Sequence, residues 1–380
     1  MNNQYKKLGN YIEIVDVRNK DLSIDKLFGV SISKRFISSI ANTVGTDFSN
    51  YKVVRKGQFA YGPVTSRNGE KVSIALLNEG DCIISSSYTV FKVCKPEELN
   101  SEYLMLWFSR SEFDRYARYK SHGSVREIFD WEQLCNVELP IPSIEEQENI
   151  VKAYKAITDR VELKKKINDN LATTLETVFI ELYQSLDDGS SVPFSDLCIL
   201  ASSKRVFAED YVIDGIPFYR GKEITQKRNG EPISDPLFIS REHFLELQRN
   251  YGVPVPGDIL ITAVGTIGNS YLVQDEEFYF KDGNIIWLKS FSEPDVNYYI
   301  YEYMQTSLFR RELEGICIGS TQTALTIIAL SNLKIKIPQA SELDSYCQNS
   351  KAIRNTIQNN NREIMRLTQV AHSLLASLSR

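Results

Sequence analysis

Cysteine, histidine and long apolar runs are all scarce in this sequence of 380 residues. The six cysteines form no C-x-x-C pair and only three histidines are present, so neither a zinc site nor a disulfide framework is indicated. No apolar run approaches the roughly 18 residues that span a bilayer, and the first residues lack the apolar core of a signal peptide. We therefore expect a cytoplasmic protein that has no metal site and makes no contact with a membrane.

Motifs of catalytic sites are absent as well. Neither a G-x-G-x-x-G loop nor a P-loop occurs, so no cofactor loop of a methyltransferase is present. The stretch DPLF at residues 235–238 faintly resembles the signature of amino-methylating enzymes, but it lacks the second proline and we interpret it as a turn. Pro294-Asp295 has no acidic-x-Lys partner of the nuclease type, and no histidine has an activating Ser or Cys motif. The sequence predicts a non-catalytic chain without a bound cofactor.

The net charge of −5 at first argues against a nucleic-acid partner, because phosphate contacts require lysine and arginine. Basic residues are nevertheless concentrated locally. Residues 110–126 carry five of them against Glu112 and Asp114, and residues 218–228 carry four against Glu223, so each run has a net charge of +3. A basic run is also typical of a solvated face, and that interpretation stays open for both.

From Ile144 to Leu182, apolar residues recur at alternating spacings of four and three, which is the coiled-coil spacing and predicts one long helix. Lys164 and Asn168 interrupt this apolar seam. A lone exposed helix of that length would leave its seam in contact with water, so we expect a second helix to pack against it.

The same pattern recurs 196 residues later, from Ser341 to Leu378, with Asn360 at the position of Lys164. The repeat extends upstream, where LCNVELPIP at residues 134–142 corresponds to LSNLKIKIP at residues 330–338. The chain is therefore a tandem duplication of a module and a helix. Because each helix follows its own module, we expect the two helices to pack as an antiparallel coiled coil with the polar residues near the middle.

The predicted modules are residues 1–142 and 187–338, and the predicted helices lie within residues 143–186 and 339–380. Each module is predicted to be α/β (α+β). In the first module, β-branched and aromatic runs between residues 51 and 93 predict strands, and an apolar face from Ser101 to about Tyr119 predicts one helix. The second module repeats this plan, with a corresponding helix over residues 297–311.

Several motifs together resemble the DNA specificity subunit of type I restriction–modification systems, and the resemblance covers the whole chain. They are LPIPSIEEQENIV at 139–151 and its second copy IKIPQASELDSYC at 335–347, GVPVPGDILITAVGTIG at 252–268, IPFYRGKEI at 216–224, VVRKGQFAYG at 53–62 and IISSSYTVFKV at 83–93. The resemblance implies that each module is a target recognition domain and that the helices form a spacer. It also implies that methylation and cleavage reside in separate chains.

The partners that the resemblance implies are double-stranded DNA, two methyltransferase (modification) subunits, and restriction or translocase subunits. S-adenosylmethionine is expected on the methyltransferase subunit and not on this chain. Two modules at a fixed separation would read two short sequences with an unread gap, as a dimer reads two half-sites. Because the modules differ in their loops, the resulting target should be bipartite and asymmetric.

Candidate DNA contacts are polar, basic or aromatic residues in or next to predicted loops. Those in the first module are Tyr61, Arg67, Lys71, Tyr88, Arg118, Lys120, His122 and Arg126. Those in the second are Arg220, Lys222, Thr266, Asn269, Ser320, Thr321 and Gln322. Gln322 and Arg220 are candidates for reading adenine and guanine, and Thr266 for a phosphate or turn contact. Tyr88 could equally be a core residue, and some of the cations could be solvated.

A second class of function fits the sequence as well. A coiled coil with two α/β modules could serve as a protein-binding adaptor that organises an assembly without contacting DNA. The net acidity of the chain favours this alternative.

Overall fold

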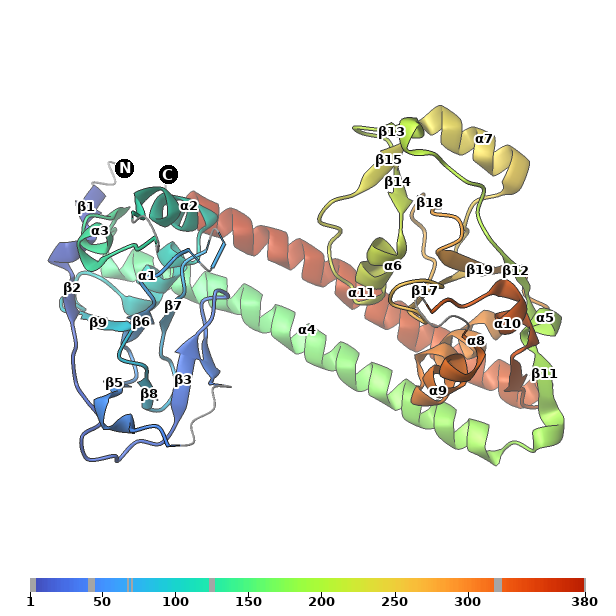
Figure 1. The fold of residues 1–380 in the computed structure, drawn as a ribbon, viewed down its shortest axis with the longest axis horizontal. Helices are drawn as coiled ribbons and strands as arrows, with labels where there is room; N and C mark the ends of the chain where they lie inside the picture. The colour runs from blue at the N-terminus through green and yellow to red at the C-terminus, as the bar shows by residue number, and fades with distance from the viewer. Residues whose placement is uncertain are drawn as a thin grey trace. The chain divides into compact units, whose positions relative to one another are not determined.

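The computed structural model describes residues 5–39, 45–66, 68–69, 71–122, 127–317 and 323–378. It divides into two compact units (Figure 1). The first unit contains residues 1–162 and 366–380, and the second contains residues 163–365. Both boundaries fall inside a long helix, so each unit holds a part of both long helices.

Two four-stranded sheets and one two-stranded sheet build the first unit (Figure 1). The strand orders are β2-β9-β6-β7, β4-β3-β8-β5 and β1-β10, and β3 and β8 are the one parallel pair among the strands described in this unit. The strands are β1 (Tyr5–Lys7), β2 (Ile12–Ile14), β3 (Leu27–Val30), β4 (Phe36–Ser38), β5 (Lys52–Val54), β6 (Phe59–Tyr61), β7 (Ile74–Leu76), β8 (Cys82–Ile84), β9 (Thr89–Val93) and β10 (Glu138–Pro140). The helices are α1 (Ser101–Phe108), α2 (Ser111–Lys120), α3 (Trp131–Cys135) and the long α4 (Ile144–Ser185).

The alternation of side chains along β6 gives the first unit its two apolar layers. Phe59 and Tyr61 face α1, and the Phe59 ring stacks on Phe91 of the neighbouring strand β9 at 4.8 Å between centroids. Ala60, between them, faces the other sheet and packs with Val54. One four-stranded sheet is therefore buried on both faces, by helices on one side and by the second sheet on the other.

The second unit has the same plan with additional elements. Its strand orders are β12-β19-β16-β17, β13-β15-β14-β18 and β11-β20. The strands are β11 (Ser191–Pro193), β12 (Ile199–Ala201), β13 (Tyr211–Val212), β14 (Ile216–Tyr219), β15 (Leu237–Ile239), β16 (Ile259–Thr262), β17 (Ser270–Leu272), β18 (Tyr279–Phe280), β19 (Ile285–Lys289) and β20 (Lys334–Lys336). The helices are α5 (Phe194–Leu197), α6 (Gly221–Arg228), α7 (Arg241–Tyr251), α8 (Val296–Gln305), α9 (Ser307–Ile316), α10 (Ile327–Asn332) and the long α11 (Ala340–Ser377).

The structure confirms the tandem duplication. Helices α9, α10 and α11 and strand β20 each begin 196 residues after α2, α3, α4 and β10, respectively, and β16 begins 200 residues after β6. Burial follows the same alternation, because Ile259 and Ile261 of β16 face the helices whereas Leu260 faces the second sheet and α6. The two modules therefore share one architecture in spite of their different sequences.

The single helix predicted from Ser101 to about Tyr119 is wrong, because two helices form there. The chain breaks at Ser109 and Arg110, and the second unit breaks at the equivalent place, at Thr306. In the second unit the break is caused by an N-cap. Thr306 Oγ1 accepts a hydrogen bond from Phe309 N at 3.2 Å, so a new helix begins at Ser307. Helix α6 was not predicted at all, since its eight residues carry a basic run and no clear apolar period.

The two long helices pack together in antiparallel orientation, as predicted. Within the second unit, Lys164 Nζ donates to Asn360 Oδ1 at 2.8 Å, whereas the Phe179 ring, further along α4, contacts Tyr346, near the start of α11. Asn360 Nδ2 also donates to Asn168 Oδ1 at 2.8 Å. The polar interruptions of the two seams therefore meet, which is the arrangement that fixes register in coiled coils.

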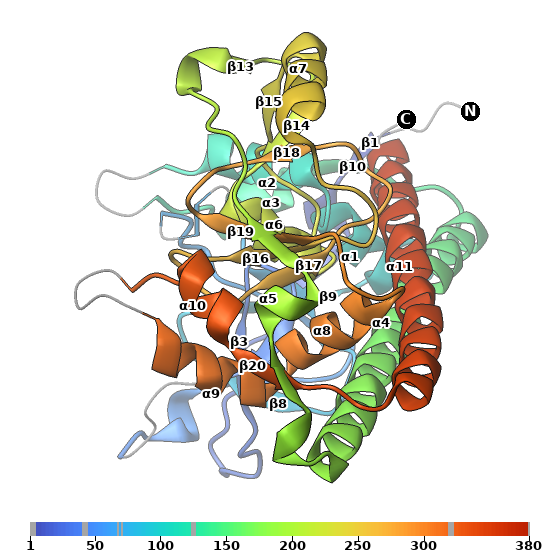
Figure 2. The same ribbon diagram turned by 90° about the vertical axis from the view of Figure 1, so that its right-hand side faces the viewer.

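Each long helix also contributes to the core of both units. In the second unit, Phe179 of α4 and Tyr346 of α11 pack with Tyr299 of α8, and Figure 2 shows α8 beside the two long helices. In the first unit, Val151 of α4 and Leu375 of α11 belong to the cluster that α1 covers. The helices are therefore structural parts of the modules as well as a spacer. Among the described residues, no helix has the length and apolarity required to cross a membrane.

Gln147 fastens the start of α4 to the first module. Its side chain is fully buried; Nε2 donates to the carbonyls of Glu98 at 2.7 Å and Pro142 at 2.8 Å, and Oε1 accepts from Asn100 N at 2.8 Å. Replacing Gln147 by Ala leaves three backbone groups without partners, and we expect the free energy of unfolding to fall by about 2–4 kcal/mol. Urea unfolding of the variant measures this loss. A loss below about 0.5 kcal/mol, the range of an ordinary surface substitution, would contradict the prediction.

Candidate nucleic-acid interface

In the first unit, the loop that follows β6 lies beside the connection between α2 and α3. Phe129 N donates to Pro63 O at 2.8 Å, Thr65 N donates to Glu127 O at 3.0 Å, and Thr65 Oγ1 donates to Ser121 Oγ at 2.9 Å. We call residues 62–73 and 121–130, as far as they are described, the first loop pair. This pairing brings together segments that contain Lys71 and His122.

The second unit has an equivalent loop pair, made of residues 263–269 and 317–326 as far as they are described. Leu325 N donates to Ala263 O at 2.9 Å, and Val264 and Ala324 form a β-bridge, which matches the bridge of Val64 with Ile128 in the first unit. Thr266 is exposed in this loop. Five candidate residues, Arg67, Arg126, Ser320, Thr321 and Gln322, lie outside the described residues.

The candidate cations of the first unit differ in whether a carboxylate is paired with them. Lys71 and Lys120 are exposed, and the Lys120 ammonium lies 5.6 Å from the centroid of the Tyr119 ring. Arg118 is also exposed but forms an ion pair with Glu127. The His122 side chain is 64% exposed, and its Nε2 lies 3.5 Å from Asp130 Oδ2. Two lysines therefore carry most of the unpaired positive charge among the described candidates.

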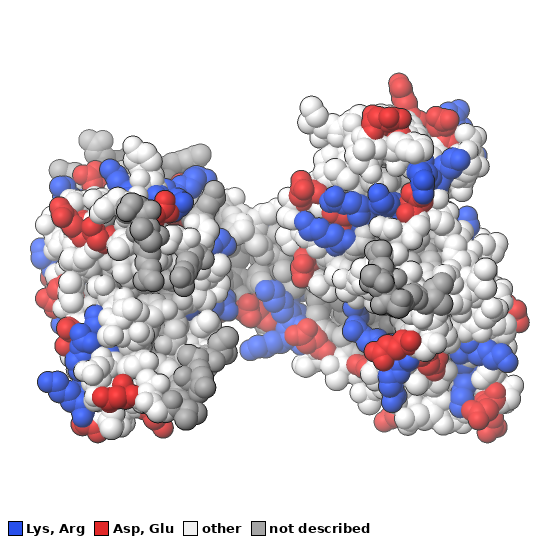
Figure 3. All heavy atoms as spheres, in the orientation of Figure 1, with Lys and Arg blue, Asp and Glu red and all other residues white. Residues whose placement is uncertain are grey.

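Arg110 is one of the five cations in the basic run of residues 110–126, but it does not contribute to a basic surface. Its side chain is 4% exposed, and its guanidinium stacks on the Trp107 ring at 4.0 Å, with Glu112 at 3.7 Å. Burial lowers the pKa of Arg110, against the raising effect of Glu112. Figure 3 shows Lys and Arg side chains interspersed with Asp and Glu over the visible face of each unit, so neither unit presents one continuous basic surface there.

Two aromatic candidates in the first module are not surface residues. Tyr61 is 1% exposed, its ring contacts Phe91 edge-on at 6.1 Å, and burial raises the pKa of its hydroxyl. Strand β6 directs its side chain into the core, so Tyr61 is not presented on the surface where it was expected. Tyr88 is half-buried and packs against the core between the two sheets, in agreement with the alternative of a core residue.

Arg220 is held within the second module by Glu223. Arg220 Nη2 donates to Glu223 Oε1 at 2.7 Å and Arg220 Nε donates to Oε2 at 3.1 Å, while Glu223 is fully buried at the start of α6. Burial opposes the charged form, but the hydrogen bonds from Arg220 lower the pKa of Glu223. Two of the guanidinium donors that could read guanine are thus already used, whereas the neighbouring Lys222 is exposed.

Asn269, a candidate DNA contact, is buried and does not lie on the surface of the module. Its Oδ1 accepts from Arg228 Nη1 at 2.9 Å and its Nδ2 donates to Thr225 Oγ1 at 2.9 Å, which ties the end of the second loop pair to α6. Arg228 in turn reaches Gln305 Oε1 at 3.1 Å. The sequence marked Arg228 only as part of a basic run, and no local signal indicated its distant amide partners.

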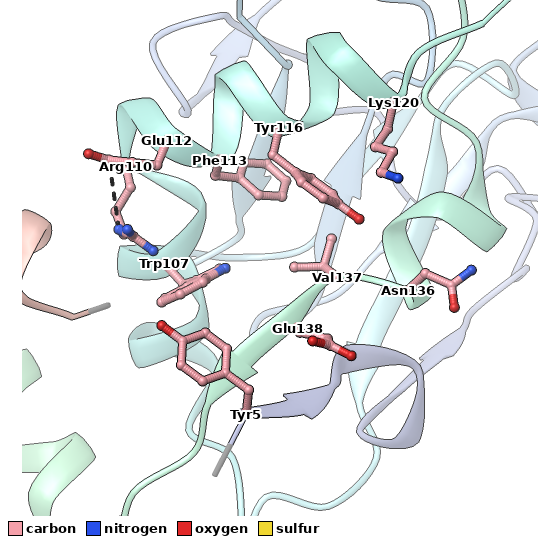
Figure 4. Close-up of a pocket in the computed structure, with 10 residues that line it drawn as sticks. All are labelled: Tyr5, Trp107, Arg110, Glu112, Phe113, Tyr116, Lys120, Asn136, Val137 and Glu138. Carbon is pink, nitrogen blue, oxygen red and sulfur yellow. Dashed lines mark ion pairs between the residues drawn. The ribbon is translucent and has the colours of Figure 1, made fainter. Parts of the chain in front are cut away.

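A cavity of about 430 Å³ opens beside α2 in the first unit, between α1, β1 and β10 (Figure 4). Trp107 lies between Arg110 and Tyr5, whose ring meets it edge-on at 6.4 Å between centroids, and Lys120 and Glu138 stand at the other end. Its lining includes two cations and two carboxylates, so it has no net charge to attract DNA.

The described residues contain no group of three or more His, Cys, Asp or Glu side chains that could hold a metal.

Comparison with known proteins agrees with this architecture. The family model described as type I restriction modification DNA specificity domain matches residues 5–173 and again residues 191–368. A putative type I restriction enzyme specificity subunit of Haemophilus influenzae is 28% identical over 255 residues, which are 65% of this chain and 62% of that protein. The match therefore spans less than two thirds of that relative.

Two solved structures are similar over nearly the whole chain. The type I restriction–modification S subunit from M. genitalium has a TM-score of 0.62 at 14% identity, covering 99% of this chain and 96% of that one. A chain from a structure on complex assembly and conformational transition of the type I R-M system has a TM-score of 0.46 at 17% identity, covering 99% and 97%. The chain belongs to the family of type I restriction–modification DNA specificity subunits.

Proposed function

We propose that this chain recognises an asymmetric, bipartite target in double-stranded DNA, with one loop pair reading each half-site. The observation that supports this most is the equivalence of the two loop pairs in modules with different loop sequences. Residues 1–142 and 187–338 would be the target recognition domains. Equivalent positions would give both modules the same approach to the duplex, and different side chains would give them different bases to read.

Within each module we assign different tasks to different residues. Lys71, Lys120 and Lys222 are exposed cations suited to phosphate contacts, which position a module without choosing a sequence. Base readout would fall to polar side chains of the loop pairs, with Gln322 as the candidate for adenine. Arg220 could contribute only through the donors that its pair with Glu223 leaves free.

The partners we propose are two methyltransferase subunits and restriction or translocase subunits. S-adenosylmethionine would bind to the methyltransferase subunits, because the present sequence contains neither a G-x-G-x-x-G loop nor a P-loop. The paired long helices would hold the two recognition domains apart and so define an unread gap between the half-sites.

Exchange of one recognition domain tests the proposal. Replacing residues 192–338 by the same region of a homologue should change one half-site completely and leave the other half-site and the gap length as they were. Methylome sequencing of cells that carry the exchanged chain with its modification subunits reads out both half-sites. A swap that altered both half-sites, or neither, would contradict separate reading and favour the protein-binding adaptor.

Neutralising Arg118, Lys120 and Arg126 together by glutamine should weaken duplex binding and flatten its salt dependence. Each lost phosphate contact reduces the slope of log K against log salt by about 0.9, because fewer counterions are released. Since Arg118 is paired with Glu127, Glu127→Gln is the matched control: it frees Arg118 and should strengthen binding instead. An unchanged slope in the triple variant would remove this surface from the interface.

A further inference from the structure

The second sheet of each module contains the same arrangement of strand pairs. In the first module β3 pairs in parallel with β8 and antiparallel with β4, and in the second module β14 pairs in parallel with β18 and antiparallel with β15. The connection between β3 and β4, residues 31–35, is therefore equivalent to the connection between β14 and β15, residues 220–236. The first is a short turn, whereas the second contains α6, which lies against β17 (Figure 1).

In the first module, Lys34 links this turn to the first loop pair. Its side chain is 10% exposed, and Nζ donates to Val72 O at 2.9 Å and to Asp114 Oδ1 at 2.5 Å. Asp114 Oδ1 also accepts from Val72 N at 3.0 Å. Both backbone groups of Val72, at the end of the loop that follows β6, are therefore held by one buried ion pair.

The backbone of Lys34 adds to this picture. Its φ is +63°, a left-handed conformation that residues other than glycine rarely adopt. Burial lowers the pKa of Lys34, whereas Asp114 raises it and the nearby Lys71 lowers it further. A strained backbone and a buried ammonium persist only where the surrounding contacts hold both in place, and here those contacts lead to the loop.

In the second module, Arg228 of α6 makes the equivalent connection. Its Nη1 donates to Asn269 Oδ1 at 2.9 Å, and Asn269 Nδ2 donates back to Thr225 Oγ1 of α6 at 2.9 Å. Asn269 is the last residue before β17, as Val72 lies just before β7. Arg228 Nη2 also donates to Gln305 Oε1 at 3.1 Å, at the end of α8.

The two modules thus reach the same arrangement with different chemistry. In each, a cation from the connection between equivalent strands fastens the end of one loop of the loop pair and also contacts a helix, α2 through Asp114 and α8 through Gln305. The first module uses a carboxylate and the second uses amides. The position 196 residues after Asp114 holds Arg310, so the contact is not a remnant of the sequence repeat.

We propose that Lys34 and Arg228 are positioning residues for sequence recognition, each holding the reading loop of its own module in the conformation that meets the bases. The inference rests on the proposed function, because it requires that the loop pairs read the two half-sites. A side chain that reads a base edge must be held within about 0.5 Å of its place, which a loop fastened only at its strand ends does not ensure. Neither cation needs to touch DNA.

The test measures discrimination, which is the affinity for the target divided by the affinity for duplexes with one base pair changed in one half-site. The full chain with its modification subunits is used, with the target taken from methylome sequencing. Lys34→Met, which keeps an apolar stem and removes the charge and the donors, should reduce discrimination at the half-site of the first module by about tenfold, the order that one base contact provides. Discrimination at the other half-site should stay as in wild type.

Arg228→Met should give the opposite pattern, with the loss at the half-site of the second module. Lys34→Arg, whose guanidinium can still pair with Asp114, should keep most of the discrimination. Gln147→Ala is the matched control for a purely structural role, because it destabilises the first module through contacts that do not involve the loop pair. It should leave discrimination at both half-sites unchanged.

Several outcomes would overturn the inference. One is a loss of affinity in Lys34→Met that is equal for the target and for every changed duplex. Another is an equal loss of discrimination in Gln147→Ala, and a third is the same pattern of half-sites for Lys34→Met and Arg228→Met. If Lys34→Met does not fold, the Arg228→Met arm decides alone. A wild-type complex without discrimination at either half-site contradicts the proposed function itself, and this is seen before any variant is compared.

Discussion

Replacing Glu302 by alanine is expected to destabilise the second unit by about 3–5 kcal/mol, because the change leaves the Arg354 guanidinium buried without its counterion. Glu302 on α8 is 1% exposed and accepts hydrogen bonds from Arg354 Nε at 2.6 Å and Ser350 Oγ at 2.8 Å. Burial opposes the charge of Arg354, but Glu302 more than offsets this and raises the pKa of Arg354. Urea unfolding of the variant and of wild type measures the difference.

The first repeat supplies the matched control for this variant. At the positions equivalent to Glu302, Ser350 and Arg354 it has Leu106, Tyr154 and Thr158. A triple variant that copies these residues into the second repeat should recover most of the lost stability, since apolar groups often replace a buried ion pair at little cost. If Glu302→Ala alone cost less than about 1 kcal/mol, the pair would not be what fastens α8 to α11.

The contrast between the repeats shows which parts of the fold the sequence could predict. The tandem duplication and the long helices were predicted correctly, because they depend on apolar periodicity, which survives divergence at an offset of 196 residues. The attachment of each module to the helices was not predicted. It depends on pairs such as Glu302 with Arg354, which lie 52 residues apart and leave no periodic signal.

The candidate site shows the same limit at the level of side chains. The sequence did contain a warning about Tyr61, because the offset of 200 residues aligns it with Ile261 in an apolar strand. No such warning existed for Arg110, whose place on the Trp107 ring depends on the break between α1 and α2. Nor did one exist for Asn269, whose amide turns inward to Arg228. Charge counted along a run predicts a basic surface only when each cation faces solvent.

Four of the candidate DNA contacts are exposed to solvent, as the sequence led us to expect. Lys71, Lys120, Lys222 and Thr266 are all exposed, and Lys71 and Thr266 lie in equivalent loops of the two modules. They remain predictions as DNA contacts. The positions of Lys71 and Thr266 make the two loop pairs the surface on which variants should be made first.

Inserting one heptad into each long helix should change the gap between the half-sites and leave both half-sites unchanged. Seven residues lengthen a helix by about 10 Å, which is roughly three base pairs at 3.4 Å each. A whole heptad keeps the a and d seam facing its partner, so the register of the seam is preserved. Insertions after Glu162 and after Met365 fall at the boundaries of the two units.

The expected effect on the original target is large, because only one module could then engage it at a time. We expect affinity for the original target to fall by about two to four orders of magnitude, which is the loss of avidity when two linked sites cannot bind together. A target with a gap longer by about three base pairs should bind as wild type binds its own. Competition binding against duplexes with graded gaps measures both quantities. The matched control is a heptad in α4 alone, which takes the seam of α4 out of register with the seam of α11 and should lower stability without producing any preferred gap. If the double insertion still preferred the original gap, the helix pair would not set the separation of the half-sites, and the distance would have to be fixed by the partner subunits.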